Sequence, residues 1–176
     1  MHATHALKIP IILDLEASGF GSGSYPIEVG IAIRSDKRFS SLIKPVRAWR
    51  HWDAAAEALH GISRELLLAH GKSVSVVAGE LNKLLHDKTV FSDGWVVDKP
   101  WLTQLYFEAG MSMSFNLSPI ELIMTEAQTE IWDACKTQVR AQLPAVRHRA
   151  SHDAWIIQET YLRSRRQLAS ASRLPP

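Results

Sequence analysis

Apolar and polar residues alternate along the first quarter of the chain with the period of a β-strand. A short isoleucine-rich run over residues 9–16 ends in two acids, Asp14 and Glu16, and similar runs follow over 26–33 and 38–44. Runs of this length, bounded by turn residues, are typical of strands. Because the connections between them are short, the pattern predicts an antiparallel meander of three strands.

From residue 53 onward the spacing of apolar residues becomes helical. We expect helices over 54–59, from a cap at Ser63 to Gly71, from Ser73 or Ser75 through Leu85, over 97–109 with Pro100 in the first turn, over 119–143 with a break near 124–125, and from 153 to about 168, with further strands over 88–92 and 115–117. Helices that cross between strands indicate an α/β fold, with a mixed sheet of about five strands flanked by helices.

Composition bounds the picture further. The chain has 176 residues, 46% of them hydrophobic and 22% charged, which fits one domain over 1–176 with a sizeable core. We expect frayed residues at 1–7 and a basic, flexible tail from about 168. The net charge of +2 neither demands nor excludes a nucleic-acid partner.

The cysteine content and the lengths of the apolar runs indicate where in the cell the protein is expected. The single Cys135 excludes a Cys-rich metal site and an intrachain disulfide. No signal peptide and no apolar run of membrane-spanning length is recognisable, so we expect a cytoplasmic protein with no membrane partner.

The two acids that end the first run are the first candidate chemistry. Side chains on a strand alternate, so Asp14 and Glu16 point to one face. Burying two like charges together is costly, and a hard divalent cation compensates well because it prefers carboxylate oxygens. The glycine-rich turn over 17–23 leaves room for a ligand near the backbone. The alternative is a strand end that carries two ordinary surface acids.

Further chemistry-bearing residues occur later in the chain. Asp98 stands at the start of a predicted helix just beyond a strand. Ser151 is a good N-cap, which puts Asp153 in the first turn of the last helix, where the helix dipole favours a negative charge. His148 then lies on the preceding loop, so that it and Asp153 can reach one point. The alternative for His148 is a surface residue beside a helix, and we expect His152 to be exposed and without a role.

Taken together, these motifs resemble a known family. Asp14-x-Glu16, then Asp98, then His148 followed five positions later by Asp153 are similar to the pattern of the DEDDh 3′–5′ exonucleases, which have the ribonuclease H-like fold. The segments 26–30 and 58–63 are similar to that family's second strand and its His-Gly-Ile-Ser/Thr segment. The resemblance runs from about residue 8 to 162.

The chain departs from the family pattern at two places. The positions before the third acid lack the usual His-Asn and Phe, and Asp93 is there a rival to Asp98. We favour Asp98 because Trp101 and Leu102 follow it at the family's spacing. The turn after Glu16 is Ala-Ser-Gly instead of Thr-Thr-Gly, which keeps one hydroxyl and the glycine.

The resemblance implies a metal-dependent 3′–5′ exonuclease that releases nucleoside 5′-monophosphates from a free 3′-OH end of DNA or RNA. Two divalent cations, Mg²⁺ or Mn²⁺, about 3.5–4 Å apart would activate water and neutralise charge. The four acids Asp14, Glu16, Asp98 and Asp153 would hold them, and His148 would be the general base. The implied substrate-binding residues are Ala17, Ser18, Gly19, His60 and Trp95, with a structural role at a helix junction equally open for His60.

Two other functions fit the sequence. One is a catalytically silent nucleic-acid-binding or scaffold domain of the same fold, and the other is a structure-selective endonuclease. The presence of the required residue type at all five catalytic positions argues against the first. A single-stranded 3′ end is the expected partner, whereas the choice between DNA, RNA and short oligonucleotides, and between monomer and homo-oligomer, stays open.

Overall fold

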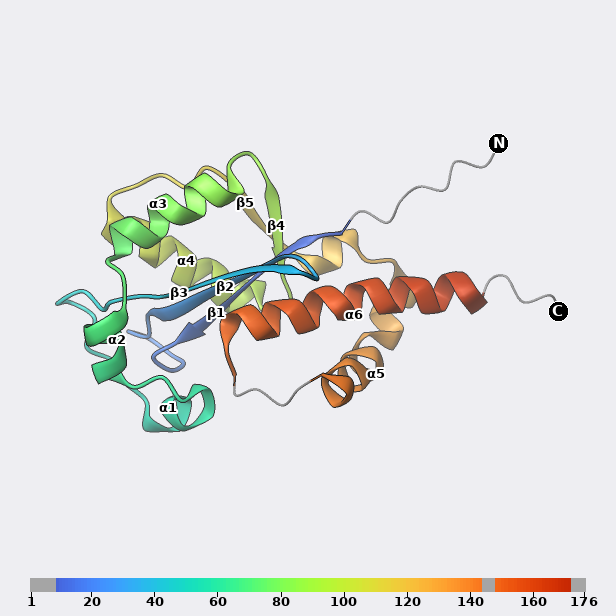
Figure 1. Cartoon of the computed structure of the whole chain (residues 1–176), viewed down its shortest axis with the longest axis horizontal. Coiled ribbons are helices and arrows are strands. Elements are labelled where there is room, and N and C mark those ends of the chain that lie inside the picture. The colour runs from blue at the N-terminus through green and yellow to red at the C-terminus, as the bar shows by residue number, and fades with distance from the viewer. Residues whose placement is uncertain (1–8, 144–147, 172–176) are drawn as a thin grey trace.

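The structure is a computed structural model, and it describes residues 9–143 and 148–171. Five strands form one mixed sheet in the order β3-β2-β1-β4-β5 (Figure 1). The strands are β1 (Ile11–Ala17), β2 (Pro26–Arg34), β3 (Lys37–Leu42), β4 (Thr89–Ser92) and β5 (Asn116–Pro119). β1, β2 and β3 are antiparallel neighbours, whereas β4 and β5 run parallel to β1. The predicted three-strand meander and mixed five-strand sheet are therefore confirmed.

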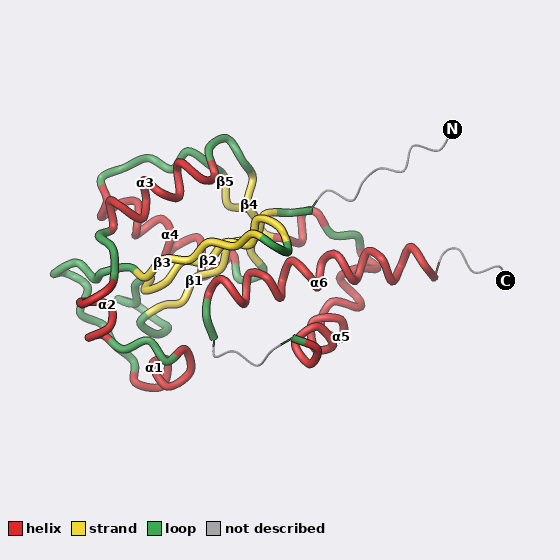
Figure 2. The backbone as a smooth tube through the Cα atoms, viewed as in Figure 1, coloured by secondary structure: helices red, strands yellow, loops and turns green. Residues whose placement is uncertain are grey.

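Helices cover both faces of this sheet (Figure 2). They are α1 (Ala54–His60), α2 (Arg64–His70), α3 (Val74–Leu85), α4 (Trp95–Ala109), the short 3-10 helix η1 (Ile120–Ile123), α5 (Glu126–Gln142) and α6 (Ala150–Ala171). α3 and α4 lie on one face, and α5 and α6 lie on the other (Figure 1). Within the described ranges, no helix is long and apolar enough to cross a membrane.

β1 divides its side chains between two cores. Leu13 and Leu15 belong to the core beneath α3 and α4, whereas Ile12 belongs to the core beneath α6. Since alternate side chains share a face, Asp14 and Glu16 lie on the same side as Ile12. The alternation of β1 thus directs both acids toward the face that α6 covers.

Two helix starts follow the predicted capping residues. Ser63 accepts the backbone N–H of Leu66, and Ser73 accepts that of Val76, which resolves the open choice between Ser73 and Ser75. Thr125 forms a capping box with Gln128 at the start of α5, at the predicted break.

The last helix differs from its prediction at both ends. α6 begins at Ala150, so Ser151 lies inside the helix and is not its N-cap. The reason lies far away in the sequence: the Glu28 carboxylate of β2 accepts the Ala150 N–H at 3.1 Å. α6 also continues to Ala171, so the expected flexible tail is helical as far as that residue. The predicted fraying of residues 1–7 and the final five residues of the tail lie outside the described residues.

α4 also starts earlier than predicted. Its first residue is Trp95, because the Gly94 carbonyl accepts the N–H groups of Val97 and Asp98 at 2.9 and 3.0 Å. Pro100 is consequently in the second turn and not in the first, whereas Asp98 occupies the first turn.

Candidate active site

The predicted catalytic residues converge on one pocket. Its volume is about 480 Å³, and its lining includes Asp14, Glu16, Asp98, His148 and Asp153. These residues come from β1, α4, α6 and the loop before α6, so no single segment forms the site. Ala17, Gly19 and His60 also line the pocket, whereas Ser18 and Trp95 do not.

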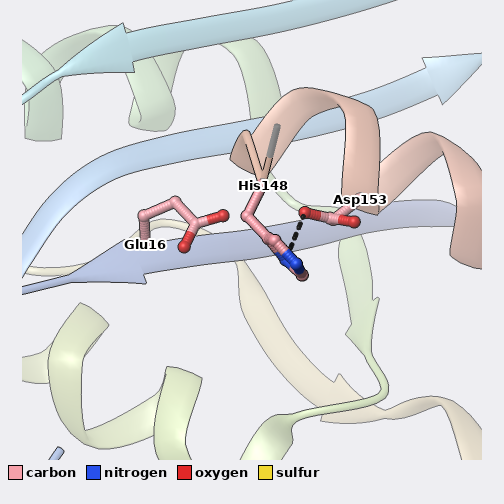
Figure 3. Close-up of side chains that lie close together, drawn as sticks. All are labelled: Glu16, His148 and Asp153. Carbon is pink, nitrogen blue, oxygen red and sulfur yellow. Dashed lines mark ion pairs between the residues drawn. The ribbon is translucent and has the colours of Figure 1, made fainter. Parts of the chain in front are cut away.

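Glu16, His148 and Asp153 lie close together (Figure 3). Each of the three offers one potential ligand atom, and these atoms all lie within 4.8 Å of one another. His148 Nδ1 lies 3.7 Å from Asp153 Oδ2. His148 stands just before α6 and is exposed, and Asp153 is in the first turn of that helix. The five-residue spacing therefore brings both side chains to one point.

The carboxylates repel one another strongly. Burial raises the pKa of Asp14 well above its ordinary value, and the negative charges of Asp98, Glu16 and Asp153 raise it further. Burial, with the charges of Asp153 and Glu28, raises the pKa of Glu16 to about 8, although Arg149 partly offsets this. Acids packed so closely and so poorly compensated suit a divalent cation, whose charge would offset their repulsion.

Asp98 and its rival Asp93 have different surroundings. Asp98 is buried, with 2% exposure, and Ser92 Oγ donates a hydrogen bond to its carboxylate. Burial raises its pKa to about 7. Asp93 instead forms an ion pair with Lys136 of α5. The carboxylate of Asp98 is also the neighbour whose charge acts most strongly on Asp14. These surroundings favour Asp98 as the third acid.

More polar groups of the turn after β1 are engaged in hydrogen bonds within the protein than we expected. The Ser18 N–H donates to the Tyr25 carbonyl at 2.9 Å, and Ser18 Oγ accepts the Tyr25 N–H at 3.1 Å. Its hydroxyl also lies 3.1 Å from His51 Nδ1. Ser18 therefore closes the β1–β2 loop instead of offering its groups to a ligand. Gly19 faces the pocket with φ of +140°, and a Cβ there would lie 2.6 Å from Asp53 Cβ.

His60 and Trp95 have separate outcomes. His60 lines the pocket, and its Nδ1 accepts the Ile62 N–H at 3.0 Å, which leaves the proton on Nε2. Burial lowers its pKa, which favours the neutral ring. The Trp95 indole donates to the Leu117 carbonyl at 3.0 Å and packs against the core beneath α3 and α4. Trp95 is thus placed for packing and not for stacking on a base in this pocket.

His152 is not exposed, contrary to expectation. It is 8% exposed and meets the Trp155 ring edge-on at 5.7 Å. Burial lowers its pKa. Because α6 begins three residues before the predicted start, His152 turns inward.

An ion pair between half-exposed Arg149 and buried Glu28 connects the site to the sheet. Glu28 is 1% exposed and accepts hydrogen bonds from Arg149 Nε and Nη2, the shortest at 2.7 Å. Arg149 follows His148 directly, so this pair fixes the loop that carries the histidine. Sequence reasoning missed this role, although an acid within an apolar strand was a signal.

Other pocket residues carry no sequence motif. Phe20, Asp53, Lys136 and Arg140 line the pocket, and the last two come from α5. Which face of an amphipathic helix meets a site depends on how the helix packs. The local sequence therefore gave no signal for Lys136 and Arg140.

Comparison with known proteins defines the class of fold. No family model matches the chain, and no curated protein matches it. The solved structures that match include structures of an RNase H-like nuclease, and the chain has a ribonuclease H-like mixed α/β fold.

Two of them are structures of exonuclease I from E. coli. Its complex with a dA16 oligonucleotide matches with a TM-score of 0.65 at 9% identity, over 92% of this chain and 42% of that chain. Its zinc-bound complex with single-stranded DNA matches with a TM-score of 0.63 at 10% identity, over 92% of this chain and 40% of that chain. The present chain therefore spans about two fifths of the length of exonuclease I.

Proposed function

We propose that this protein is a metal-dependent 3′–5′ exonuclease that hydrolyses nucleic acid from a free 3′-OH end and releases nucleoside 5′-monophosphates. The observation that carries the proposal is the convergence of four carboxylates and a histidine in one pocket. The fold similarity to exonuclease I, which has been crystallised with single-stranded DNA, supports a nucleic-acid substrate.

Four acids would hold two divalent cations, Mg²⁺ or Mn²⁺. Asp14, Glu16, Asp98 and Asp153 supply only carboxylate oxygens, which are the ligands that these cations prefer. When bound, the cations supply an activated water and neutralise the charge of the phosphate and the leaving oxygen. The raised pKa values of Asp14, Glu16 and Asp98 fit this role, because they arise first from burial and then from neighbouring negative charges, both of which a bound cation would offset.

His148 would act as the general base. Its Nδ1 faces Asp153 at 3.7 Å, so Nε2 is left for the attacking water. The side chain is 47% exposed, which allows the ring to deliver its proton to solvent after each turnover.

The turn over 17–20 would receive the end of the strand. Ala17, Gly19 and Phe20 line the pocket beside the acids, and Gly19 lets a sugar approach the backbone. His60 supplies a neutral ring on the same wall. A 3′-phosphate would bring about two negative charges against the acids, so a 3′-OH end is preferred.

The test is a time course on 5′-labelled DNA and RNA oligomers that end in 3′-OH or 3′-phosphate. With Mg²⁺ or Mn²⁺ we expect stepwise shortening of the 3′-OH oligomers, strong resistance of the 3′-phosphate oligomers, and no reaction in EDTA. Asp14→Asn is the inactive control. Equal rates on both ends, or shortening from the 5′ end, would overturn the proposal. Cleavage of circular single strands would identify an endonuclease, and binding without cleavage would identify a silent domain.

A further inference from the structure

Helix α5 brings two positively charged side chains to a pocket whose other charges are acidic. Lys136 and Arg140 both line the pocket, and they stand one helical turn apart on the same side of α5. The other charged residues in its lining, the two histidines aside, are Asp14, Glu16, Asp53, Asp93, Asp98 and Asp153. Lys136 and Arg140 therefore form a basic edge on an acidic pocket.

Packing fixes the orientation of α5. Cys135 and Val139 are buried and form an apolar cluster with Ile156 of α6. Lys136 and Arg140 each directly follow one of these buried residues, so they lie beside the packed stripe of the helix. Since α5 is held against α6, the basic edge keeps a constant place relative to Asp153 on α6.

The two basic side chains differ in their ion-pair and hydrogen-bond partners. Lys136 is 22% exposed at its side chain and pairs with Asp93. Arg140 is exposed, and within residues 9–143 and 148–171 no hydrogen bond or ion pair engages its guanidinium. The guanidinium is always charged and presents donors that match two phosphate oxygens at once. The edge thus combines an anchored cation with one whose donors are available to a ligand.

We propose that Lys136 and Arg140 bind backbone phosphates of the nucleic-acid strand that leads into the pocket, next to the bond that is hydrolysed. The inference rests on the proposed exonuclease function. The acids repel an approaching phosphodiester, and a cationic edge offsets this repulsion and positions the strand. Recognition through phosphates carries no base preference, so the edge serves every sequence equally.

The test measures strand binding without hydrolysis. A fluorescent single-stranded oligonucleotide is titrated, at several salt concentrations, with Asp14→Asn protein that carries Arg140→Gln or Lys136→Gln. Lys83→Gln is the matched control. Lys83 is exposed on α3, which lies on the opposite face of the sheet (Figure 1), so this variant removes one positive charge far from the pocket. Thermal unfolding of each variant checks that it is folded.

We expect Arg140→Gln to weaken binding about tenfold, as the loss of one charged hydrogen-bonded contact predicts. The slope of log affinity against log salt should fall by about 0.7, the value for one phosphate contact on a single strand. Lys136→Gln should act in the same direction, the losses should be equal on dT and dA oligomers, and Lys83→Gln should change neither quantity. In the active protein, Arg140→Gln should raise KM more than it lowers kcat.

The possible outcomes distinguish failure of this inference from failure of the proposed exonuclease function. If the wild type degrades oligomers but both α5 variants keep the parental affinity and salt slope, the basic edge is refuted and the exonuclease stands. If the wild type degrades nothing yet Arg140→Gln weakens binding as expected, the exonuclease is refuted and the basic edge stands. Weakening by Lys83→Gln to the same extent would show a general charge effect and would also overturn the inference.

Discussion

Replacing Asp98 with Asn should make the metal-free protein more stable while abolishing its activity. Asp98 is 2% exposed, and its pKa rises from an ordinary 3.8 to about 7, chiefly through burial. Each step of one in pKa corresponds to about 1.4 kcal/mol. Ionising Asp98 in the folded protein therefore costs about 4 kcal/mol relative to the unfolded chain. Asparagine is never ionised, and its Oδ1 can still accept the Ser92 hydroxyl.

The sign of the pH dependence follows from the raised pKa. The folded state binds the Asp98 proton more tightly, so stability is fully present below pH 3.8 and is lost as the pH rises through about 7. The gain from Asp98→Asn should therefore be about 2 kcal/mol at pH 5 and about 4 kcal/mol at pH 8. For a chain of this size, the larger gain corresponds to a rise in Tm of about 8–16 °C.

Urea or thermal unfolding in EDTA at both pH values provides the measurement. Asp93→Asn is the control: its carboxylate is compensated by Lys136, so its removal should bring no stabilisation. Added Mg²⁺ should stabilise the wild type at pH 8 and stabilise Asp98→Asn much less. An Asp98→Asn protein that is less stable than the wild type at pH 8, or that gains equally at both pH values, would refute the assignment of Asp98 as a buried, uncompensated acid.

Three further substitutions test the geometry around α6. His148→Ala should lower kcat about 10²–10⁴-fold with little effect on stability, whereas His152→Ala should cost about 1–2 kcal/mol of stability and largely keep kcat, because His152 packs on Trp155. Single-turnover rates and urea unfolding measure both, and the reverse pattern would mean that the base is misassigned. Gly30→Ala should destabilise the protein by about 3 kcal/mol and lower kcat, since its Cβ would lie 2.0 Å from the Ser151 nitrogen; a variant with wild-type Tm and kcat would contradict this packing.

Features that depend on local sequence could be predicted. The alternation of apolar residues in β1 placed Asp14 and Glu16 on one face, and the structure directs both to the α6 side. Ser63 and Ser73 each cap a helix as their position indicated, because a cap needs only its own first turn.

Features that depend on distant contacts could not be predicted. The start of α6 is set by Glu28, which is 122 positions away from Ala150 in the chain. The hydroxyl of Ser18 could have pointed at a ligand, but the structure uses it to hold Tyr25. Trp95 likewise has the chemistry of a stacking residue, and its hydrogen bond to Leu117 places it elsewhere. In each case the residue type allowed two roles and tertiary packing selected one.

The close approach of α6 to the sheet is what assembles the site. Gly30 pairs with Asp14 across β1 and β2, and a Cβ at Gly30 would meet backbone atoms of Ser151 and Ala150 at 2.0 and 2.1 Å. The first turn of α6 can therefore rest directly on the strand, with Glu28 accepting the N–H of its first residue. A bulkier residue at position 30 would move Asp153 away from the β1 acids.

Compensation for negative charge is unequal across this assembly, and the inequality indicates where a cation is most needed. Asp98 accepts a hydrogen bond from a serine hydroxyl, Glu16 lies in the positive field of Arg149, and Asp153 faces His148 at the N-terminus of a helix. Asp14 is the exception: every charge that shifts its pKa is negative, and no hydrogen bond or ion pair engages its carboxylate in the part of the chain that the structure describes. It also lies on the central strand, among the other three acids. A divalent cation held by these acids would therefore gain most by neutralising Asp14.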